Sequence, residues 1–168
     1  MLDSLQGALK VTELRTKIIF TLVMIFIFRL GAHIPVPGVD AEAFRQLLGS
    51  GVFFSFFNVI SGGAFKAFSL FAMSIIPYIN ASIIMQLLTV VIPHLERLSK
   101  EGDEGRKKIT QYTRYFTVVL AFLQAIGMSV IIGRYGALDN PGILSYFVVA
   151  ITLTAGTTFL MWLGEQIT

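Results

Sequence analysis

The run Ala67–Ile92, AFSLFAMSIIPYINASIIMQLLTVVI, contains no charged side chain and is followed directly by Pro93. An α-helix rises ~1.5 Å per residue and the hydrocarbon core of a bilayer is ~30 Å thick, so about 20 mainly apolar residues make one crossing. Two more uncharged runs have a suitable length, Tyr115–Gly133 and Ile143–Leu163. These three runs predict membrane-spanning helices.

The composition of the whole chain agrees with a membrane location. Of 168 residues, 55% are apolar and 14% are charged, and the mean hydropathy is +0.76. In a soluble domain of this size, about a quarter of the residues are charged. The chain has no cysteine, which excludes a disulfide framework, a thiolate metal site and a redox motif. We therefore predict an all-α membrane protein.

A shorter uncharged run, Ile18–Phe28, predicts a further crossing at the N-terminal end. It continues through Arg29 to Ile34, where the proline-rich stretch His33–Gly38 ends any helix. We expect Arg29 to snorkel towards the nearer membrane face, and we favour this over a gating or ligand role. The chain is then expected to cross the membrane four times.

The distribution of Lys and Arg predicts the orientation. Nine of the 13 basic residues lie before Ile18 or in the loop between the second and third crossings. The other four lie on the opposite side of the membrane. The positive-inside rule places both ends of the chain in the cytoplasm. The expected segments are a cytoplasmic amphipathic segment at 1–17, span 1 at 18–36, an external loop at 37–51, a half-helix at 52–66, span 2 at 67–92, a cytoplasmic loop at 93–114, span 3 at 115–133, an external loop at 134–142 and span 4 at 143–164.

The apolar stretch Val52–Ser61 does not fit a simple bundle. As a helix it would be ~15 Å long, and Val52–Ile92 as one helix would be about 60 Å, roughly twice the core thickness. Gly62-Gly63 is the expected break. At helical spacing one face is apolar and the other polar, which predicts a short amphipathic half-helix. It either lies at the membrane interface or folds back into a protein-lined cavity. The apolar face holds Phe53, Phe56, Phe57, Ile60 and Ala64, and the polar face holds Ser55, Asn58 and Ser61.

Span 2 contains a proline between two isoleucines one helical turn apart. Pro77 is expected to kink the helix about ten residues from its start, and Ile75 and Ile79 project from one face. By themselves the two isoleucines predict ordinary helix packing. Two amide side chains in the spans, Gln86 and Gln124, are expected at helix–helix contacts because polar groups are costly in lipid.

The sequence lacks the groups that catalysis requires. It contains no HExxH motif, no nucleophile elbow and no pair of intramembrane carboxylates, so neither an enzyme nor a cofactor is expected. The stretch Gly102–Lys108 has the wrong spacing for a phosphate-binding loop and predicts a solvated cytoplasmic turn. An ion or solute transporter fragment and a structural membrane scaffold remain alternatives. The transporter would need an ionisable group near the bilayer midplane, and none is evident.

Long stretches of the chain resemble the SecY family, whose members form the central subunit of the bacterial protein-translocation channel. The matching stretches are FRLG at 28–31, HIPVPGVD at 33–40, FN at 57–58, SGGA at 61–64, PYINASII at 77–84, QLLTVV at 86–91, KEGDEGRKKITQYTRY at 100–115 and MWLGEQIT at 161–168. The family has ten membrane helices in two pseudo-symmetric halves. The resemblance therefore implies an N-terminal part whose sequence would continue past the fourth span.

The resemblance also implies roles for individual residues. Ile75 and Ile79 would belong to the apolar pore ring, and the helices 67–92 and 115–133 would form one flank of the lateral gate. The half-helix would be a re-entrant plug that closes the resting pore from outside. The implied plug residues are Phe53, Phe54, Phe56, Phe57, Asn58, Ile60, Ser61, Gly62 and Gly63, and the implied gate residues are Asn80, Ile83, Gln86 and Gln124.

A pore-forming subunit of this kind would move unfolded polypeptides across the bacterial plasma membrane and release hydrophobic segments sideways into it. The implied partners are the small membrane subunits SecE and SecG, the motor ATPase SecA, the translating ribosome, signal sequences and translocating polypeptides, the remaining C-terminal half of the same protein, and membrane lipid, with no specific nucleic acid and no cofactor.

Overall fold

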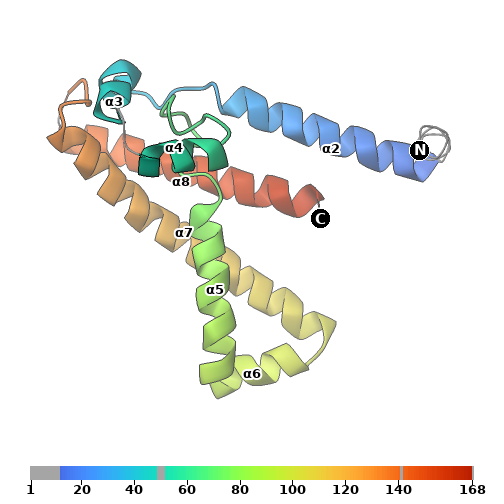
Figure 1. Ribbon diagram of the computed structural model, residues 1–168. Helices are drawn as coiled ribbons and strands as arrows, with labels where there is room; N and C mark the ends of the chain where they lie inside the picture. Colours follow the sequence, from blue (N-terminus) through green and yellow to red (C-terminus); the bar gives the residue numbers. More distant parts are fainter. Residues whose placement is uncertain (1–11, 49–51, 141, 168) are drawn as a thin grey trace.

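The computed structural model describes residues 12–48, 52–140 and 142–167 (Figure 1). Helices account for most of this part of the chain, and the two β-type pairings within it are isolated bridges, Pro35 to Ser69 and Val39 to Leu138. The prediction of an all-α protein is therefore confirmed. The helices are α2 (Thr12–Gly31), α3 (Ala41–Leu48), α4 (Val52–Ile60), α5 (Ile76–Val91), α6 (Pro93–Lys100), α7 (Asp103–Arg134) and α8 (Ile143–Ile167).

Two of these helices, α7 and α8, are long and apolar enough to cross a membrane. Helices α5 and α6 reach the required length together, but the chain bends by 100° between them, so they count as a third crossing if they form one broken span. Helix α2 is not in this set, because Glu13, Arg15, Lys17 and Arg29 place charges near both of its ends. Its crossing of the membrane remains a prediction.

The long helices pack on one another through small side chains. Helix α7 lies against α8, α5 crosses α7, α6 folds back towards α7, and α2 lies beside α8 (Figure 1). Ala125 of α7 and Ala150 of α8 are fully buried in the shared core. Small residues let helix backbones approach closely, which is how helices associate in lipid. At the far end of this contact the Arg114 Nε donates to the Glu165 Oε1 at 2.7 Å.

The structure differs from expectation between α4 and α5. We expected span 2 to be helical from Ala67, but residues 61–75 form successive turns and α5 begins at Ile76. Phe68 has a φ of +40° and Ser74 a φ of +54°, and such left-handed conformations interrupt a helix. This turn segment is nevertheless central to the core. Its buried residues are Ser61, Ala64, Phe65, Phe68, Ser69, Phe71, Ala72, Met73 and Ser74.

The expected kink at Pro77 is wrong because α5 begins only at Ile76. Pro77 occupies the first turn of α5, where a proline replaces an N–H group that has no partner in the helix. The proline therefore favours the start of α5 and does not bend its middle.

Other boundaries also shift. Helix α4 ends at Ile60, so the half-helix is shorter than 52–66, and α8 continues beyond residue 164 to Ile167. The expected loop 93–114 contains α6 and the first turns of α7, and the loop 37–51 contains α3. Helix α2 already begins at Thr12, whereas residues 1–11 of the expected amphipathic segment lie outside the described residues.

The turn segment 61–75 pairs its backbone polar groups inside the protein. The Val36 N–H donates to the Phe68 carbonyl at 3.0 Å, and the Leu70 N–H donates to the Ile34 carbonyl at 2.9 Å. The Ser69 N–H donates to the Ala64 carbonyl at 3.0 Å. An unpaired backbone group in an apolar interior is costly, so these bonds are what permit a non-helical segment at this depth.

Gly156 of α8 lies in close contact with the turn segment. A Cβ atom placed on Gly156 would lie 2.0 Å from the Leu70 carbonyl oxygen, which is a backbone atom and cannot move aside alone. By contrast, a Cβ atom on Gly127 of α7 would meet nothing within 4 Å.

We predict that Gly156→Ala destabilises the protein by about 1–3 kcal/mol, because overpacking forces the turn segment away from α8. The matched control Gly127→Ala should be neutral or stabilise by up to about 1 kcal/mol, since alanine is favoured over glycine inside a helix. Thermal unfolding in detergent measures both variants. Equal Tm values for the two would contradict the close contact at Gly156.

Candidate functional site

One face of α5 is uncovered and carries most of the residues expected at the pore and gate. Ile79 is 48% exposed and Ile83 is 51% exposed, and Asn80 and Gln86 are also exposed. Leu87 and Val90 extend the same strip at helical spacing. The opposite face packs against the other helices through three buried residues, Pro77, Ala81 and Met85. The structure therefore gathers Ile79, Asn80, Ile83 and Gln86 on one side of one helix.

Ile75 lies at the N-terminal boundary of α5. Its carbonyl accepts from the N–H groups of Tyr78 and Ile79, both at 3.1 Å, which starts the helix. Its side chain is half-buried, and its Cδ1 lies 3.8 Å from where a Cβ on Gly164 of α8 would be. The two isoleucines are thus one turn apart as expected, with Ile75 nearer to α8 and Ile79 more open.

Gln124 of α7 lies apart from Gln86. It lines an open pocket of about 300 Å³. Ile76 also lines this pocket, and Gln86 is ten residues further along α5, a rise of about 15 Å. Both amide side chains are exposed, and the helix–helix contacts expected for them remain a prediction. The other lining residues are Phe65, Ala72, Met73, Gly127, Met128 and Ile131.

The half-helix α4 presents apolar side chains outwards. Phe56 is 62% exposed and Ile60 is 47% exposed. Val59, beside them in the sequence, is 77% exposed. The side chains of Phe53, Phe54 and Phe57 lie outside the described residues.

The polar residues at the end of α4 hold the turn that follows it. The Asn58 Oδ1 accepts from the Lys66 N–H at 3.1 Å, and the Ser61 Oγ accepts from the Phe65 N–H at 3.0 Å. Gly62 and Gly63 have φ values of +60° and +90°, which glycine adopts without strain. The predicted break at Gly62-Gly63 is confirmed.

Arg29 makes a contact that the sequence does not reveal. Its side chain is exposed, as expected for a snorkelling residue, but its Nη1 also donates to the Gly62 carbonyl at 3.0 Å. This bond joins the end of α2 to the turn after α4. A bond across 33 positions depends on the tertiary fold, so no local pattern could have predicted it.

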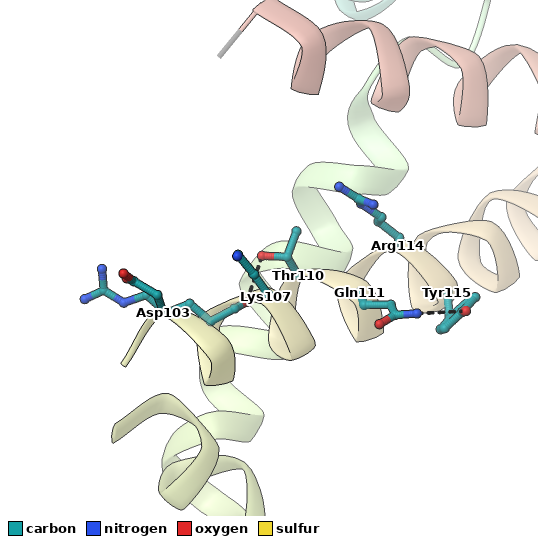
Figure 2. A pocket seen from close by; sticks show the side chains of 7 residues that line it. Asp103, Lys107, Thr110, Gln111, Arg114 and Tyr115 are labelled. Carbon is teal, nitrogen blue, oxygen red and sulfur yellow. Dashed lines mark hydrogen bonds between the residues drawn. The ribbon is translucent and has the colours of Figure 1, made fainter. Parts of the chain in front are cut away.

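The N-terminal half of α7 carries a basic groove that the sequence analysis did not predict. It encloses about 790 Å³, and Figure 2 shows its side chains along one stretch of the helix. The Gln111 amide donates to the Tyr115 hydroxyl at 3.2 Å within it. The spacing of Lys107, Gln111 and Arg114 on one helical face could have indicated it. The lining residues are Asp103, Arg106, Lys107, Thr110, Gln111, Arg114 and Tyr115.

The turn expected at Gly102–Lys108 is wrong, because α7 begins at Asp103 and only Gly102 precedes the helix. The helical part of this stretch contributes Asp103, Arg106 and Lys107 to the groove. A Cβ atom on Gly105 would lie 1.7 Å from the Leu98 carbonyl oxygen, so this glycine allows α6 to pack closely on α7. Within the described part of the chain, no three His, Asp or Glu side chains gather in a way that could hold a metal ion.

These features define a class of protein, an all-helical membrane protein with a short half-helix, a buried turn segment and an uncovered apolar helix face. The chain belongs to the SecY family, because the family model for SecY matches residues 69–168, which is more than half of its length. The resemblance inferred from the sequence motifs is therefore confirmed.

Bacterial relatives cover almost the whole of this chain. The protein translocase subunit SecY of Pseudomonas aeruginosa is 51% identical over 97% of this chain and 39% of the relative. The subunits of the same name from Bacillus subtilis and Escherichia coli are each 49% identical, over 100% and 93% of this chain and over 40% and 37% of the relatives. The chain thus spans about two fifths of the length of these curated relatives.

Proposed function

We propose that this chain contributes to the pore of a protein-conducting channel that moves unfolded polypeptides across the bacterial plasma membrane and releases hydrophobic segments into the lipid. The relatives are named as translocase subunits, which supports the proposal. The observation that carries it is the uncovered strip of α5, which holds Ile79, Asn80, Ile83 and Gln86 on one face. The role is that of a conducting subunit and not of an enzyme.

The chemistry of the strip suits a pore that must pass many different sequences. Isoleucine side chains repel water from a narrow constriction, so a ring that includes Ile75 and Ile79 would oppose ions by dewetting. Isoleucines offer no hydrogen bond or charge to a passing chain, so they would not hold it tightly. The remaining C-terminal half of the protein would supply the rest of the ring.

The polar members of the strip suit a lateral gate. Asn80 and Gln86 are exposed on α5, and Gln124 is exposed on α7. A gate seam with amides in it is only moderately stable when closed, because amides between helices in lipid contribute little each. A hydrophobic signal sequence that contacts the open state better would then shift the gate open.

The half-helix α4 fits the role of a plug. It has nine residues and exposes Phe56 and Ile60, so it is too short to cross a membrane and apolar enough to fill a cavity. We propose SecE, SecG, SecA and the translating ribosome as partners of the complete channel, on the strength of family membership.

The proposed orientation predicts labelling from one side. In intact cells, a cysteine at Asp139, between α7 and α8, should react with a membrane-impermeant maleimide, and a cysteine at Glu101, between α6 and α7, should not. Both residues are exposed, and the nine-to-four bias of Lys and Arg places Glu101 inside. Labelling at Glu101 from outside would reverse the topology.

A second prediction concerns the strip of α5. A photocrosslinker at Ile79 should capture a polypeptide stalled in the complete channel, because this side chain would line the path. The control position is Ile151 of α8, which is 58% exposed on another helix. Capture at Ile79 no stronger than at Ile151 would count against a pore role.

A third prediction concerns α4. Deleting residues 53–60 from the complete channel should leave the crossings intact and raise the resting ion conductance in planar bilayers, because one of two barriers is lost. Translocation should be retained. An unchanged resting current would favour a half-helix that lies at the membrane interface, and loss of assembly would show that α4 is structural.

A further inference from the structure

The hydrogen bond from Arg29 to Gly62 places a cation just beyond the C-terminal end of α4. The C-terminal end of a helix carries a partial negative charge from its unpaired carbonyl groups, and basic residues near it are stabilising. Helix α4 has no basic residue in its own last turn. The guanidinium of Arg29 supplies the positive charge from α2, with its Nη1 3.0 Å from the Gly62 carbonyl oxygen.

The end of α2 that carries Arg29 is firmly anchored. The ring of Phe28 stacks on the ring of Phe71 at 5.6 Å, and Phe71 stacks on Phe159 of α8 at 6.1 Å. A Cβ atom on Gly31 would lie only 2.1 Å from the ring of Phe71, so α2 and the turn segment are in close contact here. Arg29 is therefore presented by a rigid part of the core.

Among the described residues, the backbone N–H groups and the Asn58 side chain at the end of α4 form local hydrogen bonds. The N–H groups of Gly62 and Gly63 donate to Val59 and Asn58 at 3.1 Å and 2.9 Å, and Asn58 also accepts from Lys66. These bonds shape the turn but do not attach it to a neighbouring helix. Among the described residues, α3 reaches this turn at Lys66, through a 3.4 Å bond from the Arg45 Nε.

We propose that Arg29 is a latch that holds α4 in place at its hinge, so that displacement of the half-helix requires the guanidinium to leave the Gly62 carbonyl. Arg29 acts as a positioning residue, and the consequence for sealing rests on the plug role proposed above. Hydrogen bonds from a charged donor are stronger than neutral ones, which gives the latch its strength. Because Arg29 is exposed, water can solvate the released guanidinium, and the latch is reversible.

The test uses the complete channel in lipid with a single nitroxide spin label on a cysteine at Val59, a position that is 77% exposed on α4. In Arg29→Gln the mobile component of the spectrum should increase roughly tenfold or more, as expected for loss of a hydrogen bond from a charged donor. In Arg29→Lys, which keeps the charge but loses the planar donor, the increase should be intermediate. The matched control is Arg134→Gln, an exposed arginine at the end of α7 whose replacement should leave the spectrum unchanged.

Measuring the resting conductance of the same variants tests the latch proposed for Arg29 separately from the plug role proposed for α4. A mobile label together with a raised conductance in Arg29→Gln supports both. A mobile label with unchanged conductance in Arg29→Gln and in the 53–60 deletion supports the latch and rejects the plug role. A wild-type spectrum in Arg29→Gln overturns the latch whatever the conductance. If Arg29→Gln does not assemble, a wild-type spectrum in Arg29→Lys overturns it equally.

Discussion

The constraint on which the structure depends is the need to pair the backbone polar groups of residues 61–75 away from water. This segment is not helical, yet Phe68 and Phe71 within it are each 1% exposed. In a membrane protein such a segment is tolerated only where protein surrounds it and satisfies its N–H and C=O groups. The stretch after α2 provides the partners, through the Val36 N–H and the Ile34 carbonyl. The path of the chain after α2 and the path between α4 and α5 are therefore determined together.

Close packing around this segment explains where glycine is required. Because Gly31 has no side chain, the ring of Phe71 can lie against it, and the Leu70 carbonyl lies against Gly156 in the same way. Lipid offers no hydrophobic drive for helices to associate, so contact at the van der Waals limit has to hold them together. The turn segment thus acts as a shared surface for α2 and α8, although it contributes no helix of its own.

The sequence was sufficient for the apolar parts of the long helices and for the break in the chain. Uncharged runs of suitable length predicted α8 and the part of α7 after residue 114, and Gly62-Gly63 predicted a break before α5, although the half-helix ends earlier than expected and α7 begins earlier. Composition could not separate turns from helix in residues 67–75, because a buried turn segment is as apolar as a membrane helix. The left-handed φ values fall on Phe68 and Ser74, residue types that give no signal for that conformation.

The candidate site was predictable to the extent that it depends on helical spacing. Ile79, Asn80, Ile83 and Gln86 share a face because α5 is regular there, and spacing alone gives that result. The position of Gln124 and the bond from Arg29 depend on how distant elements pack, which no local pattern contains. Pro77 illustrates the ambiguity, since a proline is consistent with a kink or with a first turn, and only the fold distinguishes them.

The arrangement also places a buried anchor between α4 and α5. Between the two helices, Ala64 and Phe68 are buried against the core, so a displacement of α4 about Gly62 and Gly63 would end before it reached them. Ile75 lies beyond this anchor, at the start of α5. In the proposed channel the half-helix would therefore leave the pore without a shift of the isoleucines. If the proposed roles hold, such a seal would have two parts, and the ring would close around a passing chain after the plug is displaced.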